Sequence, residues 1–291
     1  MRRVLELLRL VLKFPVFVLT VLAFILTVLP IYPLYLINSQ RIRPWLSWIV
    51  SFYCRFAWGI FALEVDHGGQ GDPLNGWEEE KYGGRLIVSN HLSYLDIFAL
   101  AAQRPTCFVT SVEIKETPVL GQLCQLGGCL FVERRSREHL SREVREIYEA
   151  LANGENVCVF PEGTSTNGEK VRRFKRPLFC AALDAGAIIQ PVTLNYLSVS
   201  GEKLAINNRD HVFWYGDMDF LPHLVDVFSQ SRVHVYTTWH RAFREDNCAS
   251  VSEVAERSQR IVASSYINIE KRGKEKKEAT WKNSTSSLTH T

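Results

Sequence analysis

A histidine and an aspartate stand five residues apart, directly after an apolar run of the chain. They are His91 and Asp96, within the segment NHLSYLD at 90–96, which follows the apolar residues 86–88 and precedes the apolar segment 97–101. This order predicts a buried strand, a polar turn and a helix, with both side chains near the carboxyl end of the strand. Histidine changes charge near neutral pH, and a carboxylate can fix its tautomer. Such a pair can remove a proton from a hydroxyl group.

The same turn also has a purely structural interpretation. Ser93 can cap the following helix, and Asp96, three residues later, can return the bond as in a capping box. His91 would then be an ordinary turn residue. The two interpretations are compatible, because a carboxylate has two oxygens. A catalytic interpretation therefore needs support from other segments.

An arginine follows a second apolar segment, 129–132, which we expect to be a strand. This residue, Arg134, is suited to an anionic oxygen, because a planar guanidinium binds phosphate through two parallel hydrogen bonds. A salt bridge to Glu133 or a helix cap would use the same side chain for structure instead.

A glycine-containing turn ends a third apolar run, in the segment VFPEGTSTNG at 159–168. Such a turn exposes backbone N–H groups that can bind an anion. A tight turn with Gly163 at positive φ is the simpler interpretation. The segment is not a phosphate-binding P-loop, because Glu169 and Lys170 stand where that motif requires lysine and serine or threonine.

A proline lies inside a further predicted strand, 188–194. This residue is Pro191. Proline has no backbone N–H, so within sheets it is confined mainly to edge strands and irregularities. Pro191 therefore predicts either a sheet edge or a distorted wall of a site.

These segments, taken in order, resemble the glycerolipid acyltransferase family, which includes 1-acylglycerol-3-phosphate acyltransferases and related lysophospholipid acyltransferases. The resemblance covers about residues 80–200. The matching residues are Asn90, His91 and Asp96, then Gly128, Phe131 and Arg134, then Phe160, Pro161, Glu162, Gly163 and Thr164, and finally Pro191 and Val192.

The resemblance implies acyl transfer from an acyl-CoA or acyl-carrier-protein thioester to the hydroxyl of a lysoglycerolipid. The first expected acceptor is 1-acylglycerol-3-phosphate, which would give phosphatidate. His91 would be the general base and Asp96 would orient it. The residues expected at the acceptor site are Gly128, Phe131, Arg134, Glu162, Gly163, Thr164, Lys175 and Pro191. Because a thioester is already activated, neither a metal nor a cofactor is expected.

Two cations of the family pattern are missing from this chain. Ser165 stands where phosphatidate-forming members commonly carry arginine, and Ser111 stands where many members carry lysine. Either Lys175, Arg172 or Arg173 compensates, or the head group is not a bare phosphate monoester. The form Glu-Gly-Thr-Ser-Thr resembles lyso-ornithine-lipid and lysophospholipid acyltransferases. A thioester hydrolase or a non-catalytic lipid-binding protein of the same fold would also be compatible with these motifs.

Strand-like and helix-like segments alternate from residue 63 onward. We expect strands at 63–65, 86–89, 107–110, 129–132, 157–160, 188–194, 212–215 and 232–238. We expect helices at 95–102, 119–126, 136–153, 177–185, 222–229 and 251–269. This order predicts an α/β fold with a mixed, largely parallel sheet flanked by helices.

Two lipophilic stretches, 16–37 and 45–63, precede the α/β region. No residue between Lys13 and Arg41 is charged, and basic residues flank the first stretch on both sides. Because basic flanks prefer the cytoplasmic side, we expect a helical hairpin that dips into one leaflet or lies in its interface, rather than a single spanning helix. The catalytic domain would then lie on the cytoplasmic face of the membrane.

The expected domain organisation has three parts. Residues 1–63 form the membrane-associated hairpin, 64–270 the acyltransferase α/β domain, and 271–291 a basic, disordered tail. The net charge of +3 is too small to indicate nucleic acid. The seven cysteines contain no Cys-x-x-Cys pair, which disfavours a zinc or redox motif. The expected partners are a lysolipid, an acyl donor and membrane lipid.

Overall fold

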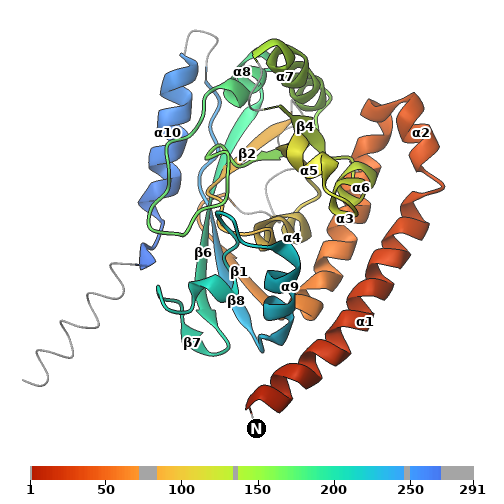
Figure 1. Cartoon of the computed structure of the whole chain (residues 1–291). Helices are drawn as coiled ribbons and strands as arrows, with labels where there is room; N and C mark the ends of the chain where they lie inside the picture. Colours follow the sequence, from red (N-terminus) through yellow and green to blue (C-terminus); the bar gives the residue numbers. More distant parts are fainter. Residues whose placement is uncertain (1, 72–83, 134–136, 246–249, 270–291) are drawn as a thin grey trace, which may run out of the picture.

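The computed structural model describes residues 2–71, 84–133, 137–245 and 250–269 (Figure 1). Its strands are β1 Leu63–Gly68, β2 Arg85–Ser89, β3 Cys107–Ser111, β4 Leu130–Val132, β5 Asn156–Val159, β6 Ile188–Val199, β7 Glu202–Lys203 and β8 Val233–Trp239. Its α-helices are α1 Arg2–Val28, α2 Tyr32–Ile37, α3 Ser39–Phe61, α4 Leu95–Gln103, α5 Val112–Glu116, α6 Leu120–Leu126, α7 Arg137–Ala152, α8 Pro177–Asp184, α9 Phe220–Ser229 and α10 Val251–Ser264.

The strands form one mixed sheet in the order β1-β8-β6-β2-β5-β3-β4, with β7 paired to β6. The pairs of β6 with β7 and with β8 are antiparallel, and the other pairs are parallel. β2, which leads to the His–Asp turn, lies in the middle between β6 and β5. The predicted fold class, a largely parallel sheet flanked by helices, is confirmed.

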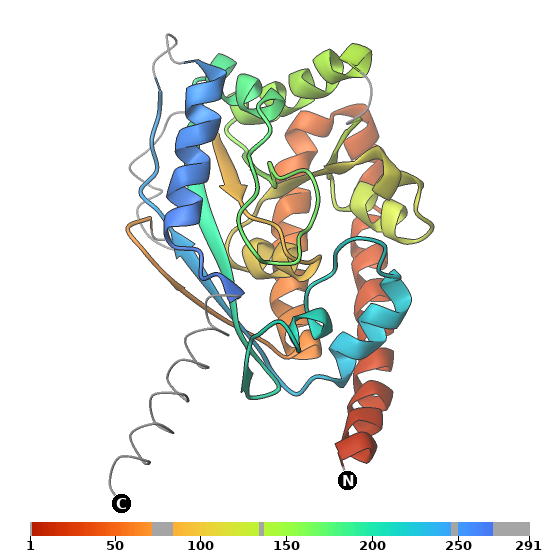
Figure 2. The ribbon, with the colours of Figure 1, turned by 60° about the vertical axis from the view of Figure 1, so that its left-hand side comes forward.

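Helices cover both faces of the sheet. Alternate residues of β2 point to opposite faces: Ile87 packs with α3, α4 and α9, whereas Leu86 and Val88 pack with α7, α8 and α10. Figure 2 shows α10 along one face of the sheet, on the far side from α1. Because both faces are buried, β2 is apolar throughout its centre, as parallel strands in such folds are.

One expected strand is absent, and one of the two alternatives for Pro191 is excluded. The segment 212–215 forms no strand: a 3₁₀ turn, Arg209–His211, leads into irregular chain whose Trp214 N–H donates to the carbonyl of Leu92. Its apolar residues are buried because they cover the His–Asp turn, so burial alone produced the strand-like pattern. Pro191 does not mark a sheet edge, since β6 lies between β8 and β2. The Pro191 carbonyl accepts from the N–H of His240, the residue that directly follows β8.

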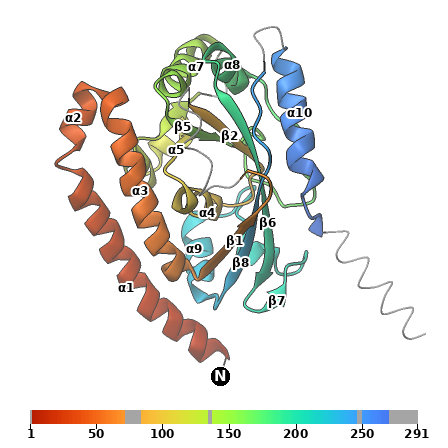
Figure 3. The same ribbon diagram turned by 180° about the vertical axis from the view of Figure 1, so that it is seen from behind.

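The amino-terminal region is a pair of helices running in opposite directions, α1 and α3, joined through α2 (Figures 1 and 3). The segment Val4–Val28 of α1 is long and apolar enough to cross a membrane, with a mean hydropathy of 2.4 and only 6% of its most apolar window buried. α1 is therefore not a core helix. On α3 an exposed aromatic stripe consists of Trp45, Trp48, Phe52 and Phe56. These exposed faces fit a lipid surface.

The hairpin is fastened to the α/β domain along α9. The ring of Phe17 lies 5.8 Å from that of Phe61 and 5.3 Å from that of Phe228. Arg9 and Lys13 donate to the carbonyls of Ser229 and Gln230 at the carboxyl end of α9, where cations are favourable. The contacts join the amino-terminal helices and the α/β domain into one packed unit.

Candidate active site

The side chains of His91 and Asp96 meet at the carboxyl end of β2. The strand ends at Ser89 and α4 begins at Leu95, so the pair lies on the connecting turn and the first turn of the helix. His91 Nδ1 is 2.8 Å from Asp96 Oδ2. The His91 side chain is 19% exposed, whereas that of Asp96 is fully buried. A partly accessible imidazole backed by a buried carboxylate is a suitable general base.

The carboxylate of Asp96 has hydrogen-bond partners at both oxygens. Oδ2 accepts from the backbone N–H groups of Leu92, at 2.7 Å, and Ser93, at 3.0 Å, in addition to facing His91. Oδ1 accepts from the hydroxyl of Tyr196 at 2.7 Å. These donors stabilise an ionised carboxylate in a buried position.

The turn combines the catalytic and capping interpretations. Asp96 supplies the carboxylate half of a capping box by accepting the N–H of Ser93. The other half is absent, because no side chain caps the start of α4, which Tyr94 directly precedes. One oxygen of Asp96 thus serves the helix start and His91 together.

Strand β6 holds the turn from the side. The side-chain amide of Asn90 donates to the Leu194 carbonyl at 3.0 Å, and its oxygen accepts the Leu194 N–H at 2.8 Å. Two residues further along β6, Tyr196 reaches Asp96. Sequence reasoning missed Tyr196, since it lies 100 residues from its partner. The only signal was a hydroxyl-bearing aromatic in an apolar strand, which usually seeks a polar partner when buried.

The segment after β5 holds the main chain of His91 through hydrogen bonds. Oε1 of Glu162 accepts the His91 N–H at 2.9 Å, and its Oε2 accepts the N–H of Arg172 at 2.8 Å. The His91 carbonyl accepts the N–H of Thr166 at 2.9 Å. The ring of Phe160 stacks on the imidazole at 4.0 Å between centroids. Both backbone groups of His91 and one face of its ring are therefore fixed by this segment.

Burial raises the pKa of Glu162 to about 7, and its two backbone bonds act against that rise. The side chain is 4% exposed. Because each of its oxygens already accepts a backbone N–H, the ionised form suits this position better than the acid, which would have only one strong acceptor.

A cation stands beside the glycine of this segment. Gly163 has φ +80°, and a β-carbon built there would come within 2.5 Å of Lys175 Nζ. The Lys175 backbone N–H donates to the carbonyl of Pro161, which keeps the two parts of the segment together. Thr164, next to Gly163, is exposed. Glu162, Gly163, Thr164 and Lys175 thus lie together next to the His–Asp pair.

Comparison with known proteins identifies the family of this chain. A family model described as Acyltransferase matches residues 77–195. The chain is 30% identical over 237 residues to the lyso-ornithine lipid O-acyltransferase of Rhizobium meliloti (strain 1021), covering 76% of this chain and 77% of that protein. The chain belongs to the acyltransferase family.

This acyltransferase is also similar to a relative with another named acceptor and to a solved structure. It is 40% identical over 126 residues to the 1-acyl-sn-glycerol-3-phosphate acyltransferase of Neisseria gonorrhoeae, covering 43% of this chain and 49% of that protein. Its fold is similar to the crystal structure of PlsC, the 1-acyl-sn-glycerophosphate (LPA) acyltransferase of Thermotoga maritima, with a TM-score of 0.61 and 20% identity over 96% of this chain and 98% of that chain. The match to PlsC supports the fold.

Two further expected residues of the acyltransferase, Gly128 and Phe131, have their contacts with other elements. Gly128, at φ +74°, packs against Leu46 of α3, and its carbonyl accepts from the thiol of Cys107. Phe131 lies in β4, and Lys115 Nζ stands 5.4 Å from its ring centroid. No contact in the described ranges links either residue to the His–Asp pair. Arg134 lies outside the described residues.

Lys115 was not expected from the sequence. It lies on α5, a helix that the predicted elements omitted, four residues after Ser111, where family members often carry lysine. The ammonium group of Lys115 therefore lies near Phe131, although Lys115 is four residues after the position where family members often carry lysine. Within the described part of the acyltransferase, no group of three or more His, Cys, Asp or Glu side chains could hold a metal ion.

Proposed function

We propose that this acyltransferase moves a fatty acyl group from an acyl-CoA or acyl-carrier-protein thioester to the hydroxyl of a lysolipid. The observation that carries the proposal is the 2.8 Å contact between His91 Nδ1 and Asp96 Oδ2. With its proton on Nδ1 directed at the carboxylate, the imidazole keeps a lone pair on Nε2. That nitrogen can accept the proton of an acceptor hydroxyl.

The reaction would proceed without a covalent enzyme intermediate. Nε2 of His91 takes the hydroxyl proton as the oxygen attacks the thioester carbonyl. The tetrahedral intermediate collapses by breaking the carbon–sulfur bond, and the imidazolium returns its proton to the departing thiolate. The negative charge of Asp96 stabilises the imidazolium in between. Neither a metal nor a cofactor enters this sequence, because the thioester is activated and positioning supplies the rest.

The surrounding residues would divide into positioning and acceptor-binding groups. Tyr196 and Glu162 would act through their bonds to Asp96 and to the His91 main chain. Gly163, Thr164 and Lys175 would meet the acceptor head group. The other residues for which the family resemblance implies an acceptor-site role are Gly128, Phe131, Arg134 and Pro191.

Lyso-ornithine lipid is the first acceptor to test. Ser165 and Ser111 leave the site without two cations of the family pattern. A phosphate monoester carries nearly two negative charges, whereas an ornithine head group carries one carboxylate and one amine. A site with fewer cations suits the ornithine head group better, and the similarity to the Rhizobium meliloti enzyme runs over 76% of the chain.

1-Acylglycerol-3-phosphate is the second candidate acceptor, and its product would be phosphatidate. It is favoured by the 40% identity with the Neisseria gonorrhoeae enzyme and by Lys115 and Lys175, which could replace the missing cations. With either acceptor the enzyme would work at the membrane surface, with its α/β domain on the cytoplasmic face.

The test is acyl transfer by the full chain, with radiolabelled acyl-CoA and a panel of lyso-ornithine lipid, 1-acylglycerol-3-phosphate and neutral lysolipids. His91→Ala should abolish product formation while membrane binding persists. His211→Ala is the matched control, because His211 makes the same 2.8 Å contact with Asp226 on the surface. Full activity of His91→Ala would refute the assigned base. Thiol release that is as fast without an acceptor as with one would indicate a hydrolase, and no release at all would indicate a lipid-binding protein.

A further inference from the structure

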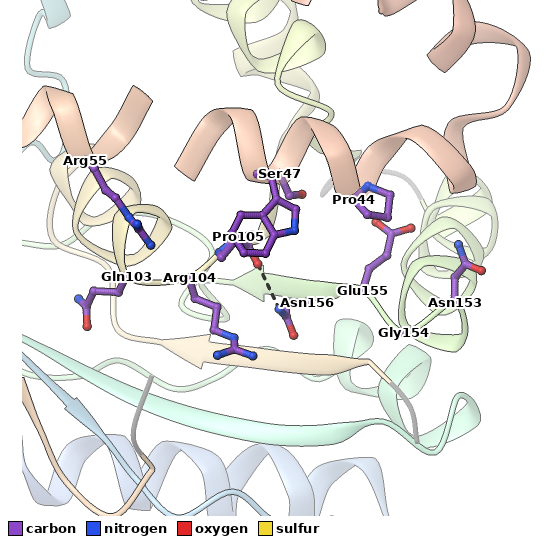
Figure 4. Close-up of a pocket in the computed structure, with 11 residues that line it drawn as sticks. Pro44, Ser47, Arg55, Gln103, Arg104, Pro105, Asn153, Gly154, Glu155 and Asn156 are labelled. Atoms are coloured by element: carbon purple, nitrogen blue, oxygen red, sulfur yellow. Dashed lines mark hydrogen bonds between the residues drawn. The ribbon is translucent and has the colours of Figure 1, made fainter. Parts of the chain in front are cut away.

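The structure has a hollow of about 460 Å³, whose lining residues are drawn in Figure 4. Its walls come from α3, from the chain before β3 and from the chain before and at the start of β5. His91 follows the carboxyl end of β2, whereas this hollow opens beside the amino ends of β3 and β5. Its volume is in the range of small-ligand sites. The hollow is thus separate from the acyl-transfer site.

Two arginines give the hollow a positive charge. Arg55 descends from α3, and Arg104 stands on the segment before β3 (Figure 4). The one acidic residue in the lining, Glu155, is already paired with Arg43 at 3.1 Å. Among the lining residues themselves, two side chains are cationic and one is acidic.

Both arginines suit an anion. Arg55 uses its Nε to donate to the carbonyl of Ala102 at 2.7 Å, and its terminal N–H groups have no partner within the described ranges. Burial and the charge of Arg85 lower the pKa of Arg104 to about 10. A negative group in the hollow would relieve that repulsion, and guanidinium groups bind phosphate well.

The hollow adjoins the aromatic stripe of α3. Trp48 lines the hollow and is also a member of that stripe, with 63% of its surface exposed. Its neighbours in the stripe, Trp45, Phe52 and Phe56, are 57–68% exposed. Tryptophan at such a position favours the boundary between head groups and acyl chains. An anion in the hollow would therefore sit at head-group level, with apolar chains running along the stripe.

We propose that this hollow binds the phosphate of an anionic membrane phospholipid through Arg55 and Arg104, while its acyl chains pack on the stripe at Trp48. The bound lipid is not the acyl acceptor, and the site does not depend on which acceptor the enzyme uses. It would orient the hairpin on membranes that contain anionic lipid.

The test measures binding of the full chain to vesicles of phosphatidylcholine and of an equimolar mixture with phosphatidylglycerol. Wild type should prefer the mixed vesicles. Arg55→Gln and Arg104→Gln should each lower affinity for the mixed vesicles about fivefold and leave affinity for phosphatidylcholine unchanged. Arg104→Lys, which keeps the charge, should retain most of the preference. Arg260→Gln, on α10, is the control for net charge and should behave as wild type.

Fluorescence locates the bound lipid. The fluorescence of Trp48 is obtained as the difference between wild type and Trp48→Phe. Phosphatidylglycerol with brominated acyl chains should quench this fluorescence more than brominated phosphatidylcholine does. Thermal unfolding of each variant checks that it is folded. Wild-type affinity in both glutamine variants, an equal loss in Arg260→Gln, or equal quenching by the two lipids would each overturn the proposal.

Discussion

The hydroxyl of Tyr196 donates a 2.7 Å hydrogen bond to Oδ1 of Asp96, the carboxylate oxygen that does not face His91. Both side chains are buried, at 2% and 0% exposure. The bond orients the carboxylate so that its second oxygen points at the imidazole. Through this bond, strand β6 helps to fix the contact between Asp96 and His91 on the turn after β2.

Replacing Tyr196 by phenylalanine should therefore slow acyl transfer. The variant keeps the ring that packs on Phe213 and removes only the hydroxyl. Because a hydrogen bond to a charged group contributes about 1.5–3 kcal/mol, we expect kcat to fall about 10-fold to 100-fold with little change in KM. Steady-state kinetics with varied acceptor and donor would measure both constants.

The control for this change is Tyr215→Phe, because the Tyr215 hydroxyl makes a similar 2.8 Å bond to Asp210 on the surface. It should retain wild-type kcat. The Nδ1 proton of His91, observed by NMR, should shift in Tyr196→Phe and not in the control. Unchanged kcat in Tyr196→Phe, or a loss explained by unfolding alone, would remove the positioning role.

Glu162→Gln should reduce the rate of every reaction that needs His91. Glutamine has one acceptor oxygen and one NH₂ group, so it cannot accept the N–H groups of both His91 and Arg172. We expect kcat for acyl transfer and the slow hydrolysis of acyl-CoA by water to fall together, each by about tenfold or more, with the acceptor KM unchanged. Glu169→Gln, in the same segment, is the control.

A direct contact between Glu162 and the acceptor leads to a different outcome. In that case KM for the lysolipid would rise and hydrolysis by water, which needs no acceptor, would be unaffected. Measuring both reactions on one preparation distinguishes the two roles.

Ser165→Arg should shift acceptor preference toward a phosphate head group. Ser165 lies two positions after Gly163 in the sequence. The side chain of Lys175 lies against Gly163. A guanidinium there adds a charge-assisted bond to phosphate, and we expect the ratio of kcat/KM for 1-acylglycerol-3-phosphate over lyso-ornithine lipid to rise about tenfold. Ser165→Gln, of similar size without charge, should leave the ratio unchanged. An equal rise in both variants would show that size and not charge matters.

The pH dependence of stability should carry a contribution from Glu155. Burial raises its pKa from 4.5 to about 7, so the folded protein binds this proton more tightly than the unfolded chain. The contribution to stability is then complete below about pH 4.5 and is lost as pH rises through about 7. Between about pH 5 and pH 8, wild type should lose about 1–3 kcal/mol that Glu155→Gln does not lose. Thermal unfolding in detergent at both pH values measures the difference, and parallel curves would contradict it.

Local patterns in the sequence predicted the order of strands and helices and the closeness of His91 to Asp96. Both depend on short-range periodicity and on a turn that follows a buried strand. The partners of that pair depend on pairing between distant strands. Tyr196 reaches Asp96 only because β6 runs beside β2, and no spacing along the chain reveals that register.

Other differences arise where one pattern has two structural outcomes. The run 212–215 is apolar because it covers the His–Asp turn, and a buried covering segment has the same apolar pattern as a strand. Pro191 is tolerated inside the sheet because its carbonyl accepts a hydrogen bond from the N–H of His240. It lies close to the point where the pairing of β6 with β2 ends and the pairing of β6 with β8 begins. Gly128 lies against α3, a contact that motif spacing does not predict.

The packing of α1 on α9 has a practical consequence for anyone preparing a detergent-free enzyme. Deleting residues 2–28 would remove Phe17 from its place beside Phe61 and Phe228 and leave those two stacked rings open to water. The truncated chain would lose the apolar helix α1 but would expose the aromatic surface that α1 covers. Exchanging the outward-facing leucines of α1 for polar residues, with Phe17, Arg9 and Lys13 retained, is the sounder route to a soluble form.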